Sequence, residues 1–205
     1  MLSAKLGHSL DPLILRVYRT LFGKRVVSPN ALTVFGLFFS LAAGAIVALR
    51  GPLFAGAICL FASGFCDVLD GAVARQAKMA TPFGGFLDSV LDRYSDLLVM
   101  LGISIYFLRL DRQDPLFSML SFFAAIGAAI IPYAKARAEA ASIGCSNGLL
   151  ERPERMILLM IGLGLNVLRP VVVILAVLTH VTVLQRVLLV KKAAQKQALG
   201  EGRRP

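Results

Sequence analysis

Six apolar segments, separated by short charged or glycine- and proline-containing junctions, limit the folds open to this chain. A run of about 20 predominantly apolar residues crosses the hydrocarbon core of a bilayer as a helix. Charged residues make up only 17% of the 205 residues, and they gather at the junctions. The expected membrane-spanning segments are 31–49, 53–75, 86–108, 115–134, 154–168 and 170–190. We therefore predict an all-α polytopic membrane protein with six transmembrane helices, because only helices satisfy their own backbone groups in lipid.

The residues before the first apolar segment have a different pattern. They carry charges throughout and lack a continuous apolar core, which argues against a cleavable signal peptide. Their apolar residues recur at helical spacing opposite Arg and Lys, which predicts an amphipathic helix on the membrane surface. These apolar residues are Leu10, Leu13, Ile14, Val17, Leu21 and Phe22. The predicted organisation is a juxtamembrane segment (1–29), a six-helix transmembrane domain (30–190) and a basic tail (191–205).

The net charge of +10 follows the predicted topology. With the amino terminus placed in the cytoplasm, 18 of the 22 Lys and Arg residues fall inside. The four outside are Arg50, Arg109, Arg112 and Arg169. This bias predicts a cell-membrane protein with both termini in the cytoplasm. No aromatic-interleaved basic run accompanies the charge, so nucleic acid is not an expected partner.

Two pairs of aspartates lie where lipid-facing helices would otherwise be apolar. Asp67 and Asp70 share one helical face, and so do Asp88 and Asp92 on the following segment. The turn between the two segments contains Pro82, Gly84 and Gly85. The two helices are therefore expected to be antiparallel neighbours whose acidic faces meet near the cytoplasmic edge of the bilayer.

Four carboxylates in one site repel one another and are costly to bury, so a positive partner is required. Oxygen ligands without His or Cys favour Mg²⁺ or Mn²⁺, and a cluster of four could hold two ions. Two-metal sites are typical of phosphoryl transfer. Two alternatives stay open at this point. The acids could cap helices or pair with Arg75 and Arg93, or they could line the pathway of a divalent-ion transporter, which would favour acids nearer the middle of the bilayer.

The acidic segment resembles a known family signature. The stretch D-V-L-D-G-A-V-A-R runs from Asp67 to Arg75. Eight residues follow, and G-G-F-L-D-S-V-L-D then begins at Gly84. This pattern is similar to DxxDGxxAR…GxxxDxxxD of the CDP-alcohol phosphotransferases. The resemblance implies an enzyme of phospholipid biosynthesis. Such an enzyme transfers a substituted phosphate from a CDP-linked lipid to an alcohol and releases CMP, in a reaction that depends on Mg²⁺ or Mn²⁺.

The resemblance also implies roles for individual residues. Asp67, Asp70 and Asp88 would ligate the metal, and Asp92 would be the general base and could also touch a metal. The CDP-lipid would be bound by Asp67, Asp70, Gly71, Ala74, Arg75 and Gly84. Asp96 has no place in the signature, and we expect it to pair with Arg93 or to lie on a polar helix face. A homodimer is a further implication of the resemblance.

The acceptor alcohol has to be argued from basic residues at three predicted cytoplasmic helix ends. These residues are Lys135, Arg137, Arg152, Arg155 and Arg186. Arginine offers fork-shaped donors to phosphate, so their convergence predicts a phosphorylated acceptor. The alternative is topological charge bias with pairing to nearby glutamates.

The segments K-A-R-A-E-A, E-R-P-E-R and a late Q-R resemble the phosphatidylinositol phosphate and archaetidylinositol phosphate synthase branch. This favours inositol 1-phosphate as the acceptor, with glycerol 3-phosphate as the first alternative and an unphosphorylated alcohol after both. The sequence leaves open whether the donor lipid is diacyl or diether.

Overall fold

The computed structural model describes residues 16, 18, 20, 27–77, 79–110, 113–145 and 148–201, the last four as backbone only. Over these ranges the chain forms six α-helices and no strand. They are α2 (Pro29–Ala48), α3 (Leu53–Gln76), α4 (Pro82–Leu108), α5 (Pro115–Ala140), α6 (Arg152–Gly164) and α7 (Leu168–Glu201). All six predicted segments are thus helical, and the all-α class is confirmed.

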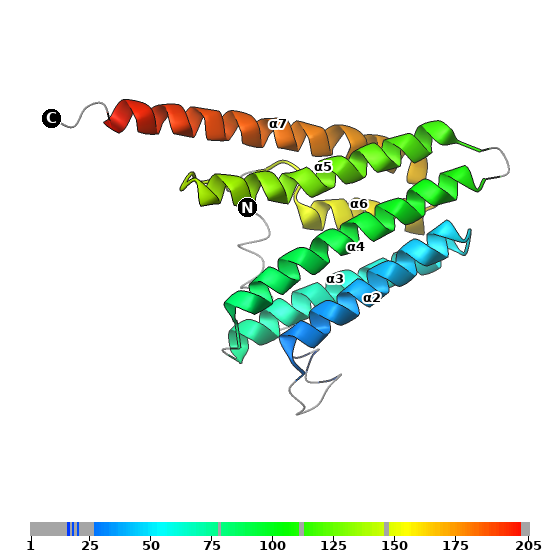
Figure 1. The fold of residues 1–205 in the computed structure, drawn as a ribbon. Helices are drawn as coiled ribbons and strands as arrows, with labels where there is room; N and C mark the ends of the chain where they lie inside the picture. The colour runs from blue at the N-terminus through cyan, green and yellow to red at the C-terminus, as the bar shows by residue number, and fades with distance from the viewer. Residues whose placement is uncertain are drawn as a thin grey trace.

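The helices form two packed groups joined by α4 and α6 (Figure 1). Helices α2, α3 and α4 lie side by side, while α5 runs along α7 and also packs against α4. The short α6 packs against α3 on one side and α7 on the other. The main apolar core includes Val47, Leu60, Ile103, Leu163 and Val172, so all of these helices except α5 are represented by a large apolar side chain. Helix α5 contributes small alanines instead.

Three helices begin with the same local pattern, a hydroxyl or carboxyl side chain followed by proline. Ser28, Thr81 and Asp114 cap α2, α4 and α5, and each accepts the backbone N–H three residues later. Proline is tolerated at the first helical position because its missing N–H would have no partner there. The predicted start of the third segment at residue 86 was therefore late, since the Thr81–Pro82 pair begins α4 one turn earlier.

Two other predicted helix ends differ from the structure. The fifth segment, predicted as 154–168, is a helix of only 13 residues that ends at Gly164. The sixth, predicted to end at residue 190, continues to Glu201. The residues after 190 are mostly Lys, Ala, Gln and Leu, which are strong helix formers and so extend α7 into the predicted tail.

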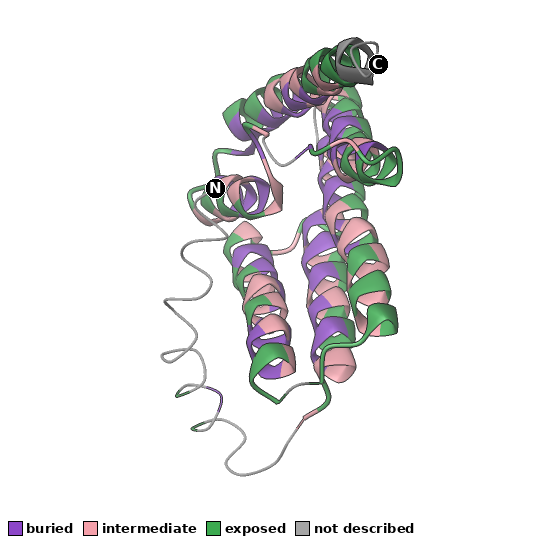
Figure 2. Ribbon diagram, turned by 90° about the vertical axis from the view of Figure 1, so that its left-hand side faces the viewer, coloured by how far each residue is buried: buried purple, intermediate pink, exposed green. Residues whose placement is uncertain are grey.

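Four helices are long and apolar enough to cross a membrane: α2, α3, α5 and the Leu168–Gln197 part of α7. Buried residues follow the inner faces of the helices, and large apolar side chains on the outer faces are exposed (Figure 2). Helix α4 carries several charged residues, and α6 is only about 20 Å long at 1.5 Å per residue. These two helices fall short by composition and length, respectively.

Most of the predicted amphipathic surface helix lies outside the described residues. Tyr18, which the structure describes, is buried against Leu32, Leu69 and Val73. Its hydroxyl accepts the backbone N–H of Val27 at 2.8 Å. This residue of the juxtamembrane segment therefore packs on the ends of α2 and α3.

Helices α2 and α4 approach each other most closely at two glycines. A Cβ atom on Gly102 would lie 2.3 Å from the carbonyl oxygen of Gly44, and a Cβ on Gly44 would lie 2.6 Å from the carbonyl of Leu98. Backbone atoms cannot move aside as a flexible side chain can. The close packing of α2 on α4, which places α3 and α4 beside each other, therefore requires glycine at both positions.

Replacement of Gly102 by alanine should accordingly destabilise the protein by about 1–3 kcal/mol through overpacking. The melting midpoint in detergent should fall by roughly 2–4 °C per kcal/mol for a chain of this size. Gly85→Ala in the same helix is the matched control, because nothing lies within 4 Å of its Cβ position. An equal midpoint for the two variants would contradict the proposed α2–α4 contact.

Candidate functional site

Three carboxylates, two from α3 and one from α4, converge where both helices pack on α2. One oxygen from each of Asp67, Asp70 and Asp88 lies within 4.8 Å of the other two. The sequence prediction that the acidic faces of these helices meet is therefore confirmed. Oδ1 of Asp88 is buried and has no hydrogen-bond partner among the described residues. A buried carboxylate oxygen without a partner is costly, so this acid trio (Asp67, Asp70 and Asp88) fits a hard divalent cation.

Helix α2 fixes one member of the acid trio. Asp70 is 7% exposed, and Thr33 donates its hydroxyl to Oδ2 of Asp70 at 2.7 Å. Thr33 is itself buried one turn after the start of α2, where its hydroxyl also lies 3.1 Å from the carbonyl of Pro29. A carboxylate held by a neighbouring hydroxyl keeps one orientation, which is how residues around a metal ligand support it. The family signature does not contain this threonine.

Asp92, the fourth aspartate of the signature, is paired with an arginine. Arg152, the first residue of α6, places Nη2 2.9 Å from Oδ1 of Asp92 and Nη1 2.8 Å from Oδ2 of Asp67. Its Nε lies 3.7 Å from Oδ1 of Asp96. Burial would lower the pKa of Arg152, but the carboxylates of Asp67, Asp92 and Asp96 outweigh burial and raise it. Arg152 therefore stays charged and links α6 to both acidic helices.

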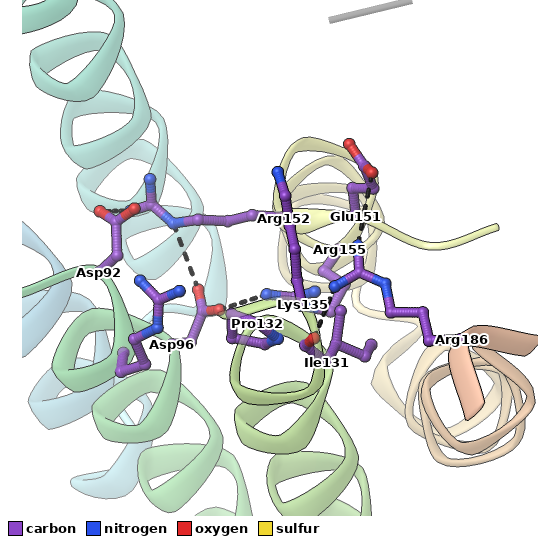
Figure 3. A pocket seen from close by; sticks show the side chains of 10 residues that line it. Asp92, Asp96, Ile131, Pro132, Lys135, Glu151, Arg152, Arg155 and Arg186 are labelled. Atoms are coloured by element: carbon purple, nitrogen blue, oxygen red, sulfur yellow. Dashed lines mark hydrogen bonds and ion pairs between the residues drawn. The ribbon is translucent and has the colours of Figure 1, made fainter. Parts of the chain in front are cut away.

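A second cluster of charge lines a pocket of about 180 Å³ between α4, α5, α6 and α7 (Figure 3). Its cationic residues are Arg93, Lys135, Arg152, Arg155 and Arg186, and its acidic residues are Asp92, Asp96 and Glu151. Cations thus outnumber acids on its walls, which favours an anionic ligand. Because Asp92 also lines this pocket, the pocket borders on the acidic site.

Two arginines of this pocket are almost completely buried. Arg155 is 5% exposed and donates to Asp96 at 2.6 Å, and Arg186 is 3% exposed and donates to the carbonyl of Ile131. Even so, Nε and Nη1 of Arg155 and Nε of Arg186 have no partner among the described residues. Glu151 lies 3.5 Å from Nη2 of Arg186. Buried, charged donors without acceptors are the strongest sign that an anion such as phosphate binds here.

Five of the six residues that the resemblance assigns to the CDP-lipid line another pocket, of about 250 Å³. They are Asp70, Gly71, Ala74, Arg75 and Gly84; Asp88 also lines this pocket, whereas the sixth residue, Asp67, does not. A Cβ on Gly71 would lie 3.2 Å from Nη1 of Arg75, and one on Gly84 would lie 3.2 Å from Oδ1 of Asn30. Glycine at these positions leaves the pocket free of the side-chain atoms that would otherwise narrow it. A third, small cavity lined by Asp67, Asp70, Asp92 and Arg152 lies among the acidic residues.

The structure brings four of the five predicted acceptor-binding cations to the pocket of Figure 3 and leaves out the fifth. Lys135 lines the pocket, whereas Arg137 is exposed and is not among the lining residues. Two residues apart on a helix point in directions about 200° apart, so one side chain faces the pocket and the other faces away. Arg152 lies in the pocket wall, but its closest partners are the acidic residues.

Sequence reasoning missed the partners of these arginines. Asp96 was expected to pair with Arg93, yet it lies 2.6 Å from Arg155, which is 59 residues away in the sequence. Thr33 was not assigned any role. Glu151 was named only as one of the glutamates that could pair with the basic residues, and it does lie 3.5 Å from Nη2 of Arg186. The spacing of Asp92 and Asp96, one helical turn apart, was the available signal, because it continues the acidic face of α4 into the cationic pocket.

Three comparisons with known proteins complete the description of the site. A family model described as CDP-alcohol phosphatidyltransferase matches residues 26–188. Archaetidylinositol phosphate synthase of Pyrococcus horikoshii is 37% identical over 167 residues, covering 81% of this chain and 85% of that protein.

Two crystal structures of Mycobacterium tuberculosis phosphatidylinositol phosphate synthase are also similar. One, with CDP-DAG bound, has a TM-score of 0.74 and 31% identity, covering 88% of this chain and 92% of that one. The other, in complex with manganese and citrate, has a TM-score of 0.73 and 30% identity, covering 90% and 88%.

Loss of the Asp88 carboxylate should weaken divalent-ion binding. Asp88→Asn removes a negative charge and leaves one acceptor oxygen, so the Kd for Mn²⁺ should rise by at least about 10-fold, the usual lower range even for residues that only support a ligand. Isothermal titration with Mn²⁺ measures this on the purified protein. Glu139→Gln, which neutralises an exposed carboxylate on α5, is the control. Equal affinities for both variants would contradict the assignment of the acid trio.

Proposed function

The chain belongs to the CDP-alcohol phosphatidyltransferase family, and we propose that it transfers a phosphatidyl-type group from a CDP-linked lipid to inositol 1-phosphate. The products are phosphatidylinositol phosphate, or its diether counterpart, and CMP. The observation that carries the acceptor assignment is the pair of buried arginines, Arg155 and Arg186, with donors that lack partners. The names of the relatives and the bound CDP-DAG of a structural neighbour agree with this proposal.

The donor would bind on the α2–α3–α4 side of the site. The pocket lined by Gly71, Ala74 and Gly84 takes the nucleotide, next to the acid trio. Asp67, Asp70 and Asp88 would hold Mg²⁺ or Mn²⁺, which neutralises the diphosphate when bound. Two ions are expected if Asp92 also becomes a ligand.

The acceptor would bind on the α5–α6–α7 side. Its phosphate lies against Lys135, Arg155 and Arg186, and this places its hydroxyl groups toward Asp92 on the same pocket wall. Asp92 accepts the hydroxyl proton. The oxygen then forms a bond to the lipid-bearing phosphorus, and the bond from that phosphorus to the CMP oxygen breaks.

The predicted topology places this reaction at the cytoplasmic face. The amino-terminal ends of α2, α4 and α6 and the carboxyl-terminal ends of α3, α5 and α7 then lie inside, with 18 of the 22 Lys and Arg residues. In this topology α4 and α6 join the four apolar helices as spans, because Arg169 after α6 pairs with Asp114 at the outer junction of α4 and α5. A homodimer stays a prediction.

CMP release tests the proposed function. The purified protein receives CDP-diacylglycerol and Mg²⁺ with inositol 1-phosphate, glycerol 3-phosphate, serine or inositol in separate reactions. CMP should appear only with inositol 1-phosphate and disappear with EDTA. If CMP is released only with glycerol 3-phosphate, then glycerol 3-phosphate is the acceptor and the assignment of inositol 1-phosphate is wrong. If no acceptor leads to CMP release, a divalent-ion transporter is the better account.

Asp92→Asn should abolish this CMP release while leaving the protein folded, because the carboxamide does not accept the hydroxyl proton. A loss of at least about 100-fold in kcat is expected for removal of a general base. Asp114→Asn, at the far end of α4 and α5, is the control. Full turnover of a folded Asp92→Asn protein would refute the assignment of the base.

Lys135→Ala should raise KM for inositol 1-phosphate about 10- to 100-fold, the range for loss of one hydrogen bond to a charged group of 1.5–3 kcal/mol. The residue is exposed, so its loss should leave stability unchanged. Lys192→Ala, an exposed cation on α7 outside the pocket, should leave KM unchanged. Arg137→Ala should behave like Lys192→Ala. If Arg137→Ala instead raised KM as much as Lys135→Ala, the separation of these two residues would be wrong.

A further inference from the structure

Arg152 is the one residue that contacts both the acid trio and the expected base among the ion pairs of the described chain. It reaches Asp67 through Nη1 and Asp92 through Nη2, at 2.8 and 2.9 Å. Asp67 therefore belongs to two arrangements: it faces Asp70 and Asp88 on one side and a guanidinium on the other. The signature explains the acids of this arrangement and gives no role to the arginine.

The start of α6 holds Arg152 in this place. Glu151 and Glu154 form a capping box, in which Glu154 accepts the backbone N–H of Glu151 at 3.1 Å. Pro153 is the second residue of the helix, where its ring is compatible with helical geometry. The backbone of Arg152 is thus fixed at a helix start, and its side chain extends from there to α3 and α4.

We propose that Arg152 occupies the place of a second divalent cation between Asp67 and Asp92, and that binding of this ion moves the guanidinium into the acceptor pocket. The proposal rests on the proposed function for the use of the ions, although the binding of the ions can be measured alone. It makes Arg152 a positioning residue that couples the second ion to the phosphorylated acceptor.

Charge supports the first half of the proposal. A guanidinium and a divalent ion cannot both lie against Oδ2 of Asp67 and Oδ1 of Asp92 without bringing two positive charges together. Two positive charges this close together repel strongly at the effective dielectric of a protein surface, and a divalent ion doubles the repulsion of a single charge. The acid trio can take one ion beside Arg152, because Asp70 and the partnerless Oδ1 of Asp88 do not contact the arginine.

The neighbourhood supports the second half. Nε of Arg152 lies 3.7 Å from Asp96, which already holds Arg155 (Figure 3). The guanidinium can therefore leave Asp92 and stay paired with Asp96, a displacement within the reach of one side chain. There the guanidinium, which already lines the pocket, would lie farther from Asp67 and Asp92 and nearer to Arg155 and Arg186. An anion in the pocket would then stabilise the displaced position of Arg152 and so raise the affinity for the second ion. By linkage, the second ion would raise the affinity for the anion by the same factor.

The alternative is that Arg152 is a fixed counterion that only stabilises the fold. Its loss would then lower stability, because buried carboxylates lose their partner. Loss of a fixed positive charge beside Asp67 and Asp92 would also tighten the binding of an ion, but any effect of phosphate on ion affinity would then be the same in the wild type and in Arg152→Gln. The two accounts therefore differ in whether the effect of the anion depends on Arg152.

Mn²⁺ titration of the whole chain in detergent tests the competition between Arg152 and the second ion, with free ion followed by electron paramagnetic resonance. The wild type should bind one ion tightly and a second at least 10-fold more weakly. Arg152→Gln should tighten the second step about 10-fold, and Arg152→Lys, which keeps the charge without the fork, should fall between the two. Lys192→Gln, an exposed charge outside the pocket, should match the wild type. Unchanged or weaker second-ion binding in a folded Arg152→Gln protein would overturn the proposal.

A second titration uses the unaltered protein, so it does not depend on the variants folding. Inositol 1-phosphate, and inorganic phosphate as the simpler probe, should each lower the Kd of the second Mn²⁺, with a larger effect in the wild type than in Arg152→Gln. Equal second-ion affinity with and without both anions would refute the coupling. CMP release is measured separately. If the titrations behave as predicted but no CMP is released, the proposed function alone is rejected. If CMP is released normally but phosphate does not change the Kd of the second Mn²⁺, this inference alone is rejected.

Discussion

Pairing of partly buried carboxylates with cations is the interaction on which the site depends. Helices α3 and α4 place five aspartates, Asp67, Asp70, Asp88, Asp92 and Asp96, within a bundle whose outer surface is apolar. Charges in such a position are costly unless they are paired. Helix α6 supplies the pairs through Arg152 and Arg155. The first turn of α6 thus carries the cations that pair with the acids of α3 and α4.

This arrangement also divides the site into two sides. In the proposed reaction the donor would bind among α2, α3 and α4, and the acceptor would bind among α4, α5, α6 and α7. Asp92 and Arg152 line the boundary, because both belong to the cationic pocket and to the small cavity among the acids. A transfer reaction needs two substrates to meet at one phosphorus, and in the proposed function each of the two pockets, donor and acceptor, would take one substrate.

The sequence predicted the chemistry of the site better than its connections. Helical spacing placed Asp67 with Asp70 and Asp88 with Asp92 on single faces, and the glycine-containing turn predicted that these faces meet, as the structure confirms. Lys135 and Arg137 could not be separated by counting cations near a helix end, although their two-residue spacing contains that information. The pairing of Arg155 with Asp96 could not be read at all, since it depends on how α6 packs, and no local pattern records it. The predictions of two helix ends were wrong because local signals were overlooked. The Thr81–Pro82 cap and the helix-forming residues after 190 were both present in the sequence.

The most direct measurement of the central claim is an anomalous-scattering map from crystals of this protein grown with Mn²⁺ and a phosphorylated polyol. The account predicts a manganese peak bound by carboxylate oxygens of Asp67, Asp70 and Asp88, and phosphate density against Arg155 and Arg186 in the neighbouring pocket. A manganese peak elsewhere, or phosphate density away from these two arginines in a protein that releases CMP, would contradict it.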